Sequence, residues 1–207
     1  MSGQNHKTVI FDYGGVISKP QNQESVTKII KKLGLKDHDH FTQVYSIYRK
    51  EIDGGLLTLS EYWVKTLREV GIVLPEEDFQ WLVLEDIISW ADINEETIGL
   101  IKDLRQNGNK LAVLSNMVTE TLDYLRNHTE FIPLFDHTFF SCDIKMVKPN
   151  PEIYEYILNH MNVAASECIF IDDLEHNCKA AELAGMKSIQ FLNTSQVKDK
   201  LTELFSR

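Results

Sequence analysis

The chain has 207 residues, of which 43% are hydrophobic and 25% are charged, a composition that excludes a disordered, collagen-like or coiled-coil protein. That length suffices to bury a core without help from disulfides or structural zinc. Asp and Glu outnumber Lys and Arg by 31 to 21, and the net charge of −10 argues against nucleic-acid or anionic-membrane partners, because both require a cationic face.

Short β-branched or aromatic segments alternate with helical patterns over much of the chain. Strands are predicted at 8–11, 110–114, 137–140, 168–171 and 187–191. Amphipathic helices are predicted at 95–106, 119–128, 151–161 and 174–184. The strands show little internal alternation, which is typical of parallel strands covered on both faces. The series therefore predicts an α/β fold, with a Rossmann-like parallel sheet core and helices on both of its faces.

The first predicted strand is followed by about 70 residues that hold helices and no convincing strand, which is far longer than an ordinary connection. Helices are predicted up to Gly34, over 61–70 with Ser60 as the N-cap, and over 79–90 after Pro75. Such an insertion must sit above the C-terminal edge of the sheet, where folds of this kind bind ligands. We expect a helical cap over 20–92, inserted into a core formed by 1–19 and 93–207.

The three cysteines, Cys142, Cys168 and Cys178, have no metal-ligand spacing, and we expect them to be free thiols in a reducing compartment. No apolar run reaches the roughly 18 residues of a membrane-spanning helix. The residues before Thr8 contain no signal-peptide core. These features predict a cytoplasmic protein.

Polar residues stand at the ends of predicted strands or in the loops beyond them, and we expect them to share one crevice. They are Asp12, Ser115 with Asn116, Lys148 with Pro149, and Asp172 with Asp173. Each motif alone is more often a turn or a helix cap. Three carboxylates at close range, however, require a cation, and oxygen ligands suit Mg²⁺. With an ammonium and a hydroxyl group beside them, the four motifs together predict a phosphoryl-transfer site.

These motifs resemble those of the haloacid dehalogenase-like hydrolase superfamily, and of its phosphatases in particular. The matching segments are Val9–Val16, Leu114–Asn116, Lys148-Pro149, and Ile171–Asp173 with Asn177. The resemblance covers the whole chain, including the cap inserted after the first motif. It implies Mg²⁺ dependence, an aspartyl-phosphate intermediate and a small phosphomonoester as the substrate.

The resemblance also implies roles for single residues. Asp12 is the nucleophile, and Lys148 neutralises both the nucleophile and the phosphate. Ser115 and Asn116 hold the phosphoryl oxygens.

The implied metal ligands are Asp12, the backbone carbonyl of Gly14, and Asp173. Asp172 stands beside Asp173 in a supporting or water-mediated role.

One position departs from the family pattern. Its phosphatases place a second Asp two residues after the nucleophile as general acid and base, whereas this chain has Gly14. The Asp-x-Gly-x-Val pattern resembles bacterial sugar-phosphate phosphatases, including a glucose-1-phosphate phosphatase. The phosphatase domain of soluble epoxide hydrolases is similar in the fourth motif but keeps the second Asp. The proton donor is therefore expected elsewhere, with Tyr13, His176 and cap residues as candidates.

The predicted function is Mg²⁺-dependent hydrolysis of a small phosphorylated metabolite, with sugar phosphates among the candidates, by a monomer or homodimer. One alternative is a catalytically weak protein that binds Mg²⁺ and a phosphorylated ligand, because a lost general acid costs about 10²–10⁴-fold in rate. A metal-independent 2-haloacid dehalogenase is disfavoured, because an acid pair would repel its anionic substrate. A signalling receiver is disfavoured because its acid pair ends the first strand.

The cap aromatics Tyr45, Tyr48, Tyr62 and Trp63 either shape the pocket or, as their spacing favours, pack between helices.

Overall fold

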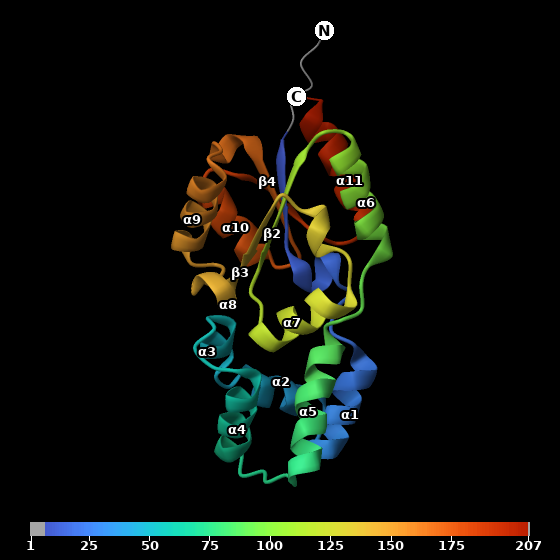
Figure 1. The fold of residues 1–207 in the computed structure, drawn as a ribbon, viewed down its shortest axis with the longest axis vertical. Helices are drawn as coiled ribbons and strands as arrows, with labels where there is room; N and C mark the ends of the chain where they lie inside the picture. Colours follow the sequence, from blue (N-terminus) through green and yellow to red (C-terminus); the bar gives the residue numbers. More distant parts are fainter. Residues whose placement is uncertain (1–6, 207) are drawn as a thin grey trace.

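The computed structural model describes residues 7–206, so the first six residues and Arg207 of the predicted core lie outside the described residues. Its strands are β1 (Thr8–Phe11), β2 (Lys110–Ser115), β3 (His137–Phe140), β4 (Cys168–Asp172) and β5 (Lys187–Gln190). All pairings are parallel, and the order in the sheet is β3-β2-β1-β4-β5 (Figure 1). The predicted α/β fold with a parallel sheet is confirmed.

The register of the central strand brings the acidic motifs together. Phe11 of β1 lies opposite Val113 of β2 and Ile171 of β4. The residue after Phe11 is Asp12, and the residue after Ile171 is Asp172. These two residues therefore lie at the same level on the adjacent strands β1 and β4. Parallel pairing thus places two carboxylates side by side at the C-terminal edge of the sheet.

Helices cover both faces of the sheet, as predicted (Figure 1). The core helices are α6 (Glu95–Gln106), α7 (Thr119–His128), α8 (Ser141–Ile144), α9 (Pro151–Met161), α10 (Glu175–Leu183) and α11 (Thr194–Phe205), with 3₁₀ turns at η2 (Ile132–Leu134) and η3 (Ala165–Glu167). Side chains alternate along β1: Val9 and Phe11 join the hydrophobic cluster under α6 and α11, and Ile10 joins the one under α9 and α10. The strands are thus buried on both sides.

Five further helices pack around a hydrophobic cluster of their own. They are α1 (Gln23–Leu33), α2 (His38–Ser46), α3 (Arg49–Asp53), α4 (Leu59–Glu69) and α5 (Glu76–Ser89). Figure 1 shows them beyond the C-terminal edge of the sheet, where the inserted cap was expected. We refer to these helices as the cap. The boundaries of a cap domain at residues 20 and 92 stay a prediction. None of the described helices has both the length and the apolar character needed to cross a membrane.

The chain enters and leaves the cap through two segments that run side by side. Ser18 and Ile93 form an antiparallel bridge. The Lys19 N–H donates to Asp92 O at 2.7 Å, and the Asn94 N–H donates to Ile17 O at 2.8 Å. The two segments that connect the core and the cap are therefore paired with each other.

Two predicted helix starts were wrong, and the local hydrogen bonds explain why. The N-cap of α4 is Thr58 rather than Ser60, because Thr58 and Glu61 satisfy each other's backbone N–H groups in a reciprocal capping box. Helix α5 begins at Glu76, directly after Pro75 and three residues before the predicted start at 79, because Pro is favoured where a helix opens and its three acidic residues suit the first turn.

Candidate active site

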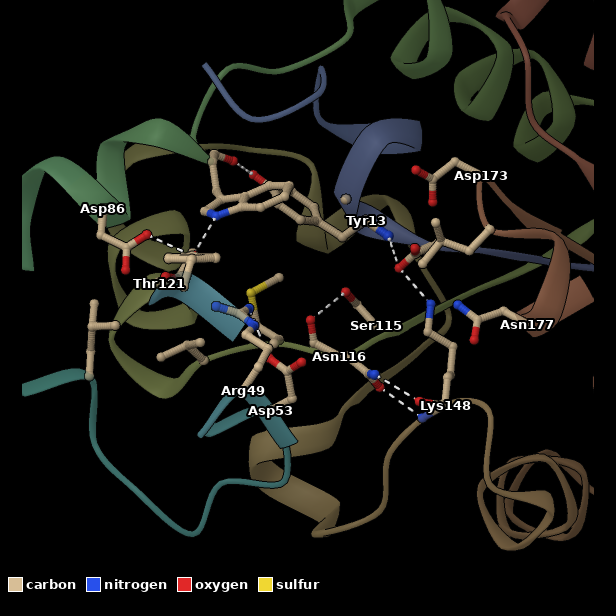
Figure 2. A pocket seen from close by; sticks show the side chains of 18 residues that line it. Tyr13, Arg49, Asp53, Asp86, Ser115, Asn116, Thr121, Lys148, Asp173 and Asn177 are labelled. Atoms are coloured by element: carbon tan, nitrogen blue, oxygen red, sulfur yellow. Dashed lines mark hydrogen bonds and ion pairs between the residues drawn. The ribbon is translucent and has the colours of Figure 1, made fainter. Parts of the chain in front are cut away.

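The predicted site residues meet in one cavity of about 270 Å³ between the C-terminal edge of the sheet and the cap (Figure 2). The core side of the cavity is lined by Asp12, Tyr13, Gly14, Ser115, Asn116, Met117, Val118, Thr121, Lys148, Asp173, Leu174 and Asn177. Asp172, the remaining predicted residue, does not line the cavity and is fully buried.

Lys148 connects two of the three carboxylates. Its Nζ lies 2.8 Å from Asp12 Oδ1 and 2.6 Å from Asp172 Oδ2. Burial opposes the charge on this ammonium, but the two neighbouring carboxylates outweigh burial and raise the pKa of Lys148. Lys148 therefore stays protonated and holds a fixed positive charge against Asp12.

The loop that carries Lys148 is held by the side chain of Asn116. Asn116 Oδ1 accepts from the Lys148 N–H at 2.8 Å, and Asn116 Nδ2 donates to Lys148 O at 3.0 Å. Ser115, buried beside it, lines the cavity, and within residues 7–206 its side chain makes one long contact of 3.3 Å, from Oγ to Asn116 O. The amide of Asn116 thus positions Lys148, and the hydroxyl of Ser115 is loosely engaged.

Both oxygens of Asp172 are used by the protein. Oδ1 accepts from the Leu174 N–H at 2.9 Å and from Asn177 Nδ2 at 3.0 Å. Oδ2 accepts from Lys148 Nζ at 2.6 Å and from Asn177 Nδ2 at 3.1 Å. Asp173, in contrast, is half-buried and lines the cavity. Asp173 therefore faces the cavity, whereas Asp172 is held by protein groups.

The polar contacts of Asp12 fall on one oxygen. Among the described residues, Oδ1 accepts from the Tyr13 N–H at 2.6 Å and pairs with Lys148. Burial raises the pKa of Asp12 to about 7, against the opposing charge of Lys148 and with a further contribution from Asp172. The Asp12 carboxylate is thus desolvated, with Oδ2 outside this hydrogen-bond pair.

The charges of the site match a divalent cation. Asp12, Asp172 and Asp173 each have a carboxylate oxygen, and these atoms lie within 4.8 Å of one another. Their three negative charges face the single positive charge of Lys148, which leaves a formal charge of −2. Carboxylate oxygens and a backbone carbonyl, which Gly14 offers at the same cavity, are donors that Mg²⁺ prefers. The residues present therefore fit a magnesium ion.

The two glycines of the first motif have different reasons to be glycine. Gly15 has φ +70°, and a β-carbon there would come within 2.8 Å of Asp173 Oδ2. At Gly14 the nearest atom to such a β-carbon is Trp90 Cζ3 at 3.7 Å, an ordinary contact. Gly15 lets the turn after β1 approach Asp173, while the side of Gly14 faces an indole ring.

The cap contributes polar side chains to the cavity wall that the sequence analysis did not identify. They are Arg49, Asp53, Asp86 and Trp90. Arg49 Nη2 lies 2.8 Å from Asp53 Oδ1, and its guanidinium stacks 4.9 Å from the ring centre of Tyr45. A signal for the first two was present in the sequence, because residues four apart on a helix are neighbours and opposite charges then pair.

Asp86 anchors a chain of aromatic donors in the cap. Its Oδ1 accepts from the Tyr45 hydroxyl at 2.8 Å, and its Oδ2 accepts from Trp63 Nε1 at 2.9 Å. The Tyr45 hydroxyl in turn accepts from Trp90 Nε1 at 3.2 Å. Burial raises the pKa of Asp86. These bonds fix the part of the cavity wall around Asp86 (Figure 2), and the indole of Trp90 there is the nearest neighbour of the α-carbon side of Gly14.

Most of the cap aromatics pack between helices, as their spacing in the sequence favours. Tyr62 and Trp63 are fully buried in the cap cluster, and the Tyr48 hydroxyl contacts Glu69 rather than the cavity. Of the four aromatics named from the sequence, only Tyr45 lines the cavity.

Neither named proton donor is placed for that role. The Tyr13 hydroxyl donates to Trp90 O at 2.7 Å, and burial raises its pKa. His176 is exposed and does not line the cavity.

Comparisons with known proteins agree with this geometry. A family model described as haloacid dehalogenase-like hydrolase matches residues 6–185. The chain is 31% identical to the sesquiterpene phosphatase astK of Aspergillus oryzae and 25% identical to a D-ribitol-5-phosphate phosphatase of Bacteroides thetaiotaomicron. The alignments cover 96% of this chain and 96% of the first relative, and 97% and 98% for the second. The chain spans 38% of the length of the mouse and pig bifunctional epoxide hydrolases that it also matches.

A solved structure shows the same fold. It is a HAD family enzyme of Bacteroides thetaiotaomicron in complex with magnesium and inorganic phosphate, with a TM-score of 0.72 and 22% sequence identity. The superposition covers 89% of this chain and 93% of that one.

Proposed function

The chain belongs to the haloacid dehalogenase-like hydrolase family, and from that membership we propose that it is a Mg²⁺-dependent phosphatase acting on a small phosphomonoester through a phosphorylated Asp12. Its hydrolase class follows from the family, and two of its relatives are named phosphatases. Mg²⁺, the intermediate and the substrate class belong to the proposal.

The arrangement around Asp12 is the observation that carries this proposal. Lys148 neutralises Oδ1, and Oδ2 stands outside that hydrogen-bond pair at the floor of the cavity. A carboxylate attacks a phosphate only when the negative charges of both partners are offset. Lys148 supplies one positive charge. The formal charge of −2 that remains on the three carboxylates and Lys148 together is the charge that a divalent cation would neutralise.

The reaction then has two displacements. Asp12 Oδ2 attacks phosphorus, the bond to the leaving-group oxygen breaks, and an aspartyl phosphate forms. A water molecule next attacks the same phosphorus, which releases inorganic phosphate and restores the carboxylate. Bound at Asp12, Asp173 and Gly14 O, Mg²⁺ would offset the charge on the phosphoryl oxygens. Ser115, which lines the cavity, would donate a hydrogen bond to one of those oxygens, and Asn116 keeps the Lys148 loop in position.

The walls of the cavity bear on the substrate. The cap side combines the apolar surfaces of Leu59 and Trp90 with the charged Arg49, Asp53 and Asp86. Such a wall suits a small metabolite with both apolar and hydroxyl-bearing surfaces. The named relatives act on a sugar-alcohol phosphate and a sesquiterpene phosphate, and we include sugar phosphates and prenyl phosphates in the substrate class to be screened. A cytoplasmic location, and a monomer or homodimer without nucleic-acid partners, complete the proposal.

The test follows nitrophenol release from p-nitrophenyl phosphate, with resolution of the first turnover. Three samples are compared: the protein with Mg²⁺, the protein with EDTA, and Asp12→Asn with Mg²⁺. We expect steady release that requires both Mg²⁺ and Asp12. Release of about one nitrophenol per enzyme followed by a stall would mean that Asp12 is phosphorylated while water is not activated. That result would favour the alternative of a catalytically weak protein, which follows from the absence of an Asp at position 14. Absence of any Asp12-dependent release would overturn the proposal.

A further inference from the structure

A phosphate ester with a basic leaving group needs a proton donor, and most ionisable side chains on the core side of the cavity are already engaged. Asp12 is the nucleophile of the proposed function, Asp173 is placed to bind the metal, and Lys148 is held between two carboxylates. The Tyr13 hydroxyl donates its proton to Trp90 O at 2.7 Å. Among the described residues, the core side of the cavity therefore offers no uncommitted acid.

The cap side offers four ionisable groups, and three of them are unsuited to proton transfer. The Arg49 guanidinium does not release its proton in proteins. Asp86 accepts from two donors, at 2.8 Å and 2.9 Å, one on each oxygen. The hydroxyl of Tyr45 donates to Asp86 and accepts from Trp90 Nε1. Among the residues that line the cavity, Asp53 remains.

We propose that Asp53, at the end of the cap helix α3, is the general acid and base of the phosphatase reaction. The inference rests on the proposed function. In Figure 2 the side chains of Arg49 and Asp53 extend from the α3 region into the same cavity as Ser115 and Asn116. A leaving group above the phosphoryl position must extend from the floor of that cavity toward the cap.

The position of Asp53 is fixed by contacts between the cap and the core. Ser141 Oγ donates to Asp53 O and accepts from the Met117 N–H at 2.9 Å, which ties the end of α3 to the loop after β2. Two residues further on, Gly55 O accepts from Lys145 Nζ at 2.8 Å. These contacts hold the end of α3 against the core, so that Asp53 lines the cavity even though it belongs to the cap.

Gly55 shows how closely this segment of the cap approaches the core. Its φ is +65°, and a β-carbon there would come within 3.0 Å of Cys142 O. Only glycine allows the chain after α3 to pack this tightly against α8. The docked position of Asp53 is thus specified by sequence as well as by hydrogen bonds.

The surroundings of Asp53 suit a group that gains and loses a proton. Its side chain is 18% exposed, and burial raises its pKa. The charges of Arg49, from its own helix, and of Lys148, from the core, oppose this shift. On the cap side it also faces Asp86, whose pKa Asp53 raises in turn. The carboxyl is thus partly exposed to the cavity, and it is ion-paired to Arg49 through Oδ1 at 2.8 Å.

Asp53 gives a proton in the first step of the reaction and regains one in the second. In the first step Asp12 Oδ2 forms a bond to phosphorus, the bond from phosphorus to the leaving oxygen breaks, and protonated Asp53 gives its proton to that oxygen. In the second step the Asp53 carboxylate takes a proton from the water that attacks phosphorus. Phosphate leaves, Asp12 is a carboxylate again, and Asp53 is protonated for the next cycle.

The experiment compares two leaving groups in the first turnover of the protein with Mg²⁺. Nitrophenolate leaves without a proton, whereas phenolate needs one. We expect Asp53→Asn to release nitrophenol from p-nitrophenyl phosphate within about threefold of the unchanged protein in the first turnover. Its release of phenol from phenyl phosphate should fall by about 10²–10⁴-fold. After one nitrophenol per enzyme the variant should stall, because its aspartyl phosphate lacks a base.

Glu51→Gln is the matched control, because Glu51 lies on the same helix, loses the same charge and does not line the cavity. It should behave like the unchanged protein with both substrates. Equal losses for the two leaving groups in Asp53→Asn, or no loss for either, would overturn the role of Asp53. If the unchanged protein shows no Asp12-dependent release, the proposed function fails, and the role of Asp53 fails with it.

A measurement without any variant guards against misfolding of Asp53→Asn. The kcat/KM of the unchanged protein is followed against pH for both substrates. For phenyl phosphate we expect an added fall toward high pH as Asp53 loses its proton, and this fall should be absent for p-nitrophenyl phosphate. Coincident profiles would contradict an acid at Asp53.

Discussion

Asp173 packs so closely against Gly15 that a β-carbon at position 15 would lie 2.8 Å from Asp173 Oδ2. Gly15 also has φ +70°, a conformation that costs other residues about 1–2 kcal/mol. We therefore expect Gly15→Ala to lower the free energy of unfolding by at least that amount and to displace Asp173. Phosphatase activity at limiting Mg²⁺ should fall more than at saturating Mg²⁺.

The adjacent glycine provides the control. Gly14 has φ −64°, and a β-carbon there meets only Trp90 Cζ3 at 3.7 Å. Gly14→Ala keeps the backbone carbonyl and should change the free energy of unfolding by less than about 1 kcal/mol. Urea denaturation of both variants, with and without Mg²⁺, makes the comparison. Similar losses in the two variants would contradict the close approach of Gly15 to Asp173.

Asp12 should make the metal-free protein less stable as pH rises. Burial raises its pKa from 3.8 to about 7 in the folded state. A raised pKa stabilises the fold while the group is protonated, and that stabilisation is lost as pH rises through the folded value. Relative to Asp12→Asn, the unchanged protein in EDTA should lose up to about 4 kcal/mol between pH 4 and pH 8.

The measurement is urea denaturation of both proteins across that pH range. Mg²⁺ should flatten the difference, because a bound cation favours the ionised carboxylate. Asp199→Asn, a change at an exposed position of α11, should run parallel to the unchanged protein. A difference between the unchanged protein and Asp12→Asn that is constant with pH would show that Asp12 is not desolvated.

Mg²⁺ should raise the melting temperature even without a substrate. A ligand that binds only the folded protein stabilises it by about 2.7 kcal/mol at 100 times its Kd, or several degrees for a chain of this size. Asp173→Asn should remove most of this shift, because Asp173 is a carboxylate that faces the cavity. Asp199→Asn should keep it. Equal Mg²⁺ shifts in Asp173→Asn and the unchanged protein would exclude Asp173 as a ligand.

The parallel sheet could be predicted because its strands are short apolar segments with clear breaks between them. The strands at Thr8–Phe11 and His137–Phe140 agree to the residue, and the other three agree within one residue at the C-terminal end. The cap was harder. Its helices α2 and α3 were not predicted from the sequence, because their apolar faces are short: α2 buries Phe41 and Val44, and α3 buries Ile52 alone. Where the helices of the cap begin depends on side-chain caps such as Thr58.

The floor of the cavity could be predicted because each of its residues stands at or beyond a strand end or belongs to a family motif. Asp12, Ser115, Lys148 and Asp173 all line it. The cavity wall that the cap contributes could not be predicted, because its residues are brought together by packing between helices that are distant in sequence. Asp53 becomes part of the site through a backbone contact with Ser141, and no local pattern reports such a contact.

Ser141 should be essential for the docking of the cap. It is fully buried, donates to Asp53 O and accepts from the Met117 N–H at 2.9 Å. Ser141→Ala leaves both backbone groups without this partner, and each such loss in a buried position costs about 1–3 kcal/mol. We expect a loss of about 2 kcal/mol in the free energy of unfolding. We also expect a higher KM for phosphomonoesters, because the segment that carries Asp53 is released from the core.

Ser46→Ala is the matched control, because Ser46 Oγ makes a single bond of 2.7 Å to Gln43 O at an exposed position within the cap. It should change the free energy of unfolding by no more than about 0.5 kcal/mol and leave KM unchanged. Urea denaturation and steady-state kinetics on both variants separate the two roles of Ser141. A destabilised Ser141→Ala with an unchanged KM and kcat would mean that this hydroxyl supports the fold alone. Such a result would detach the position of α3 from catalysis.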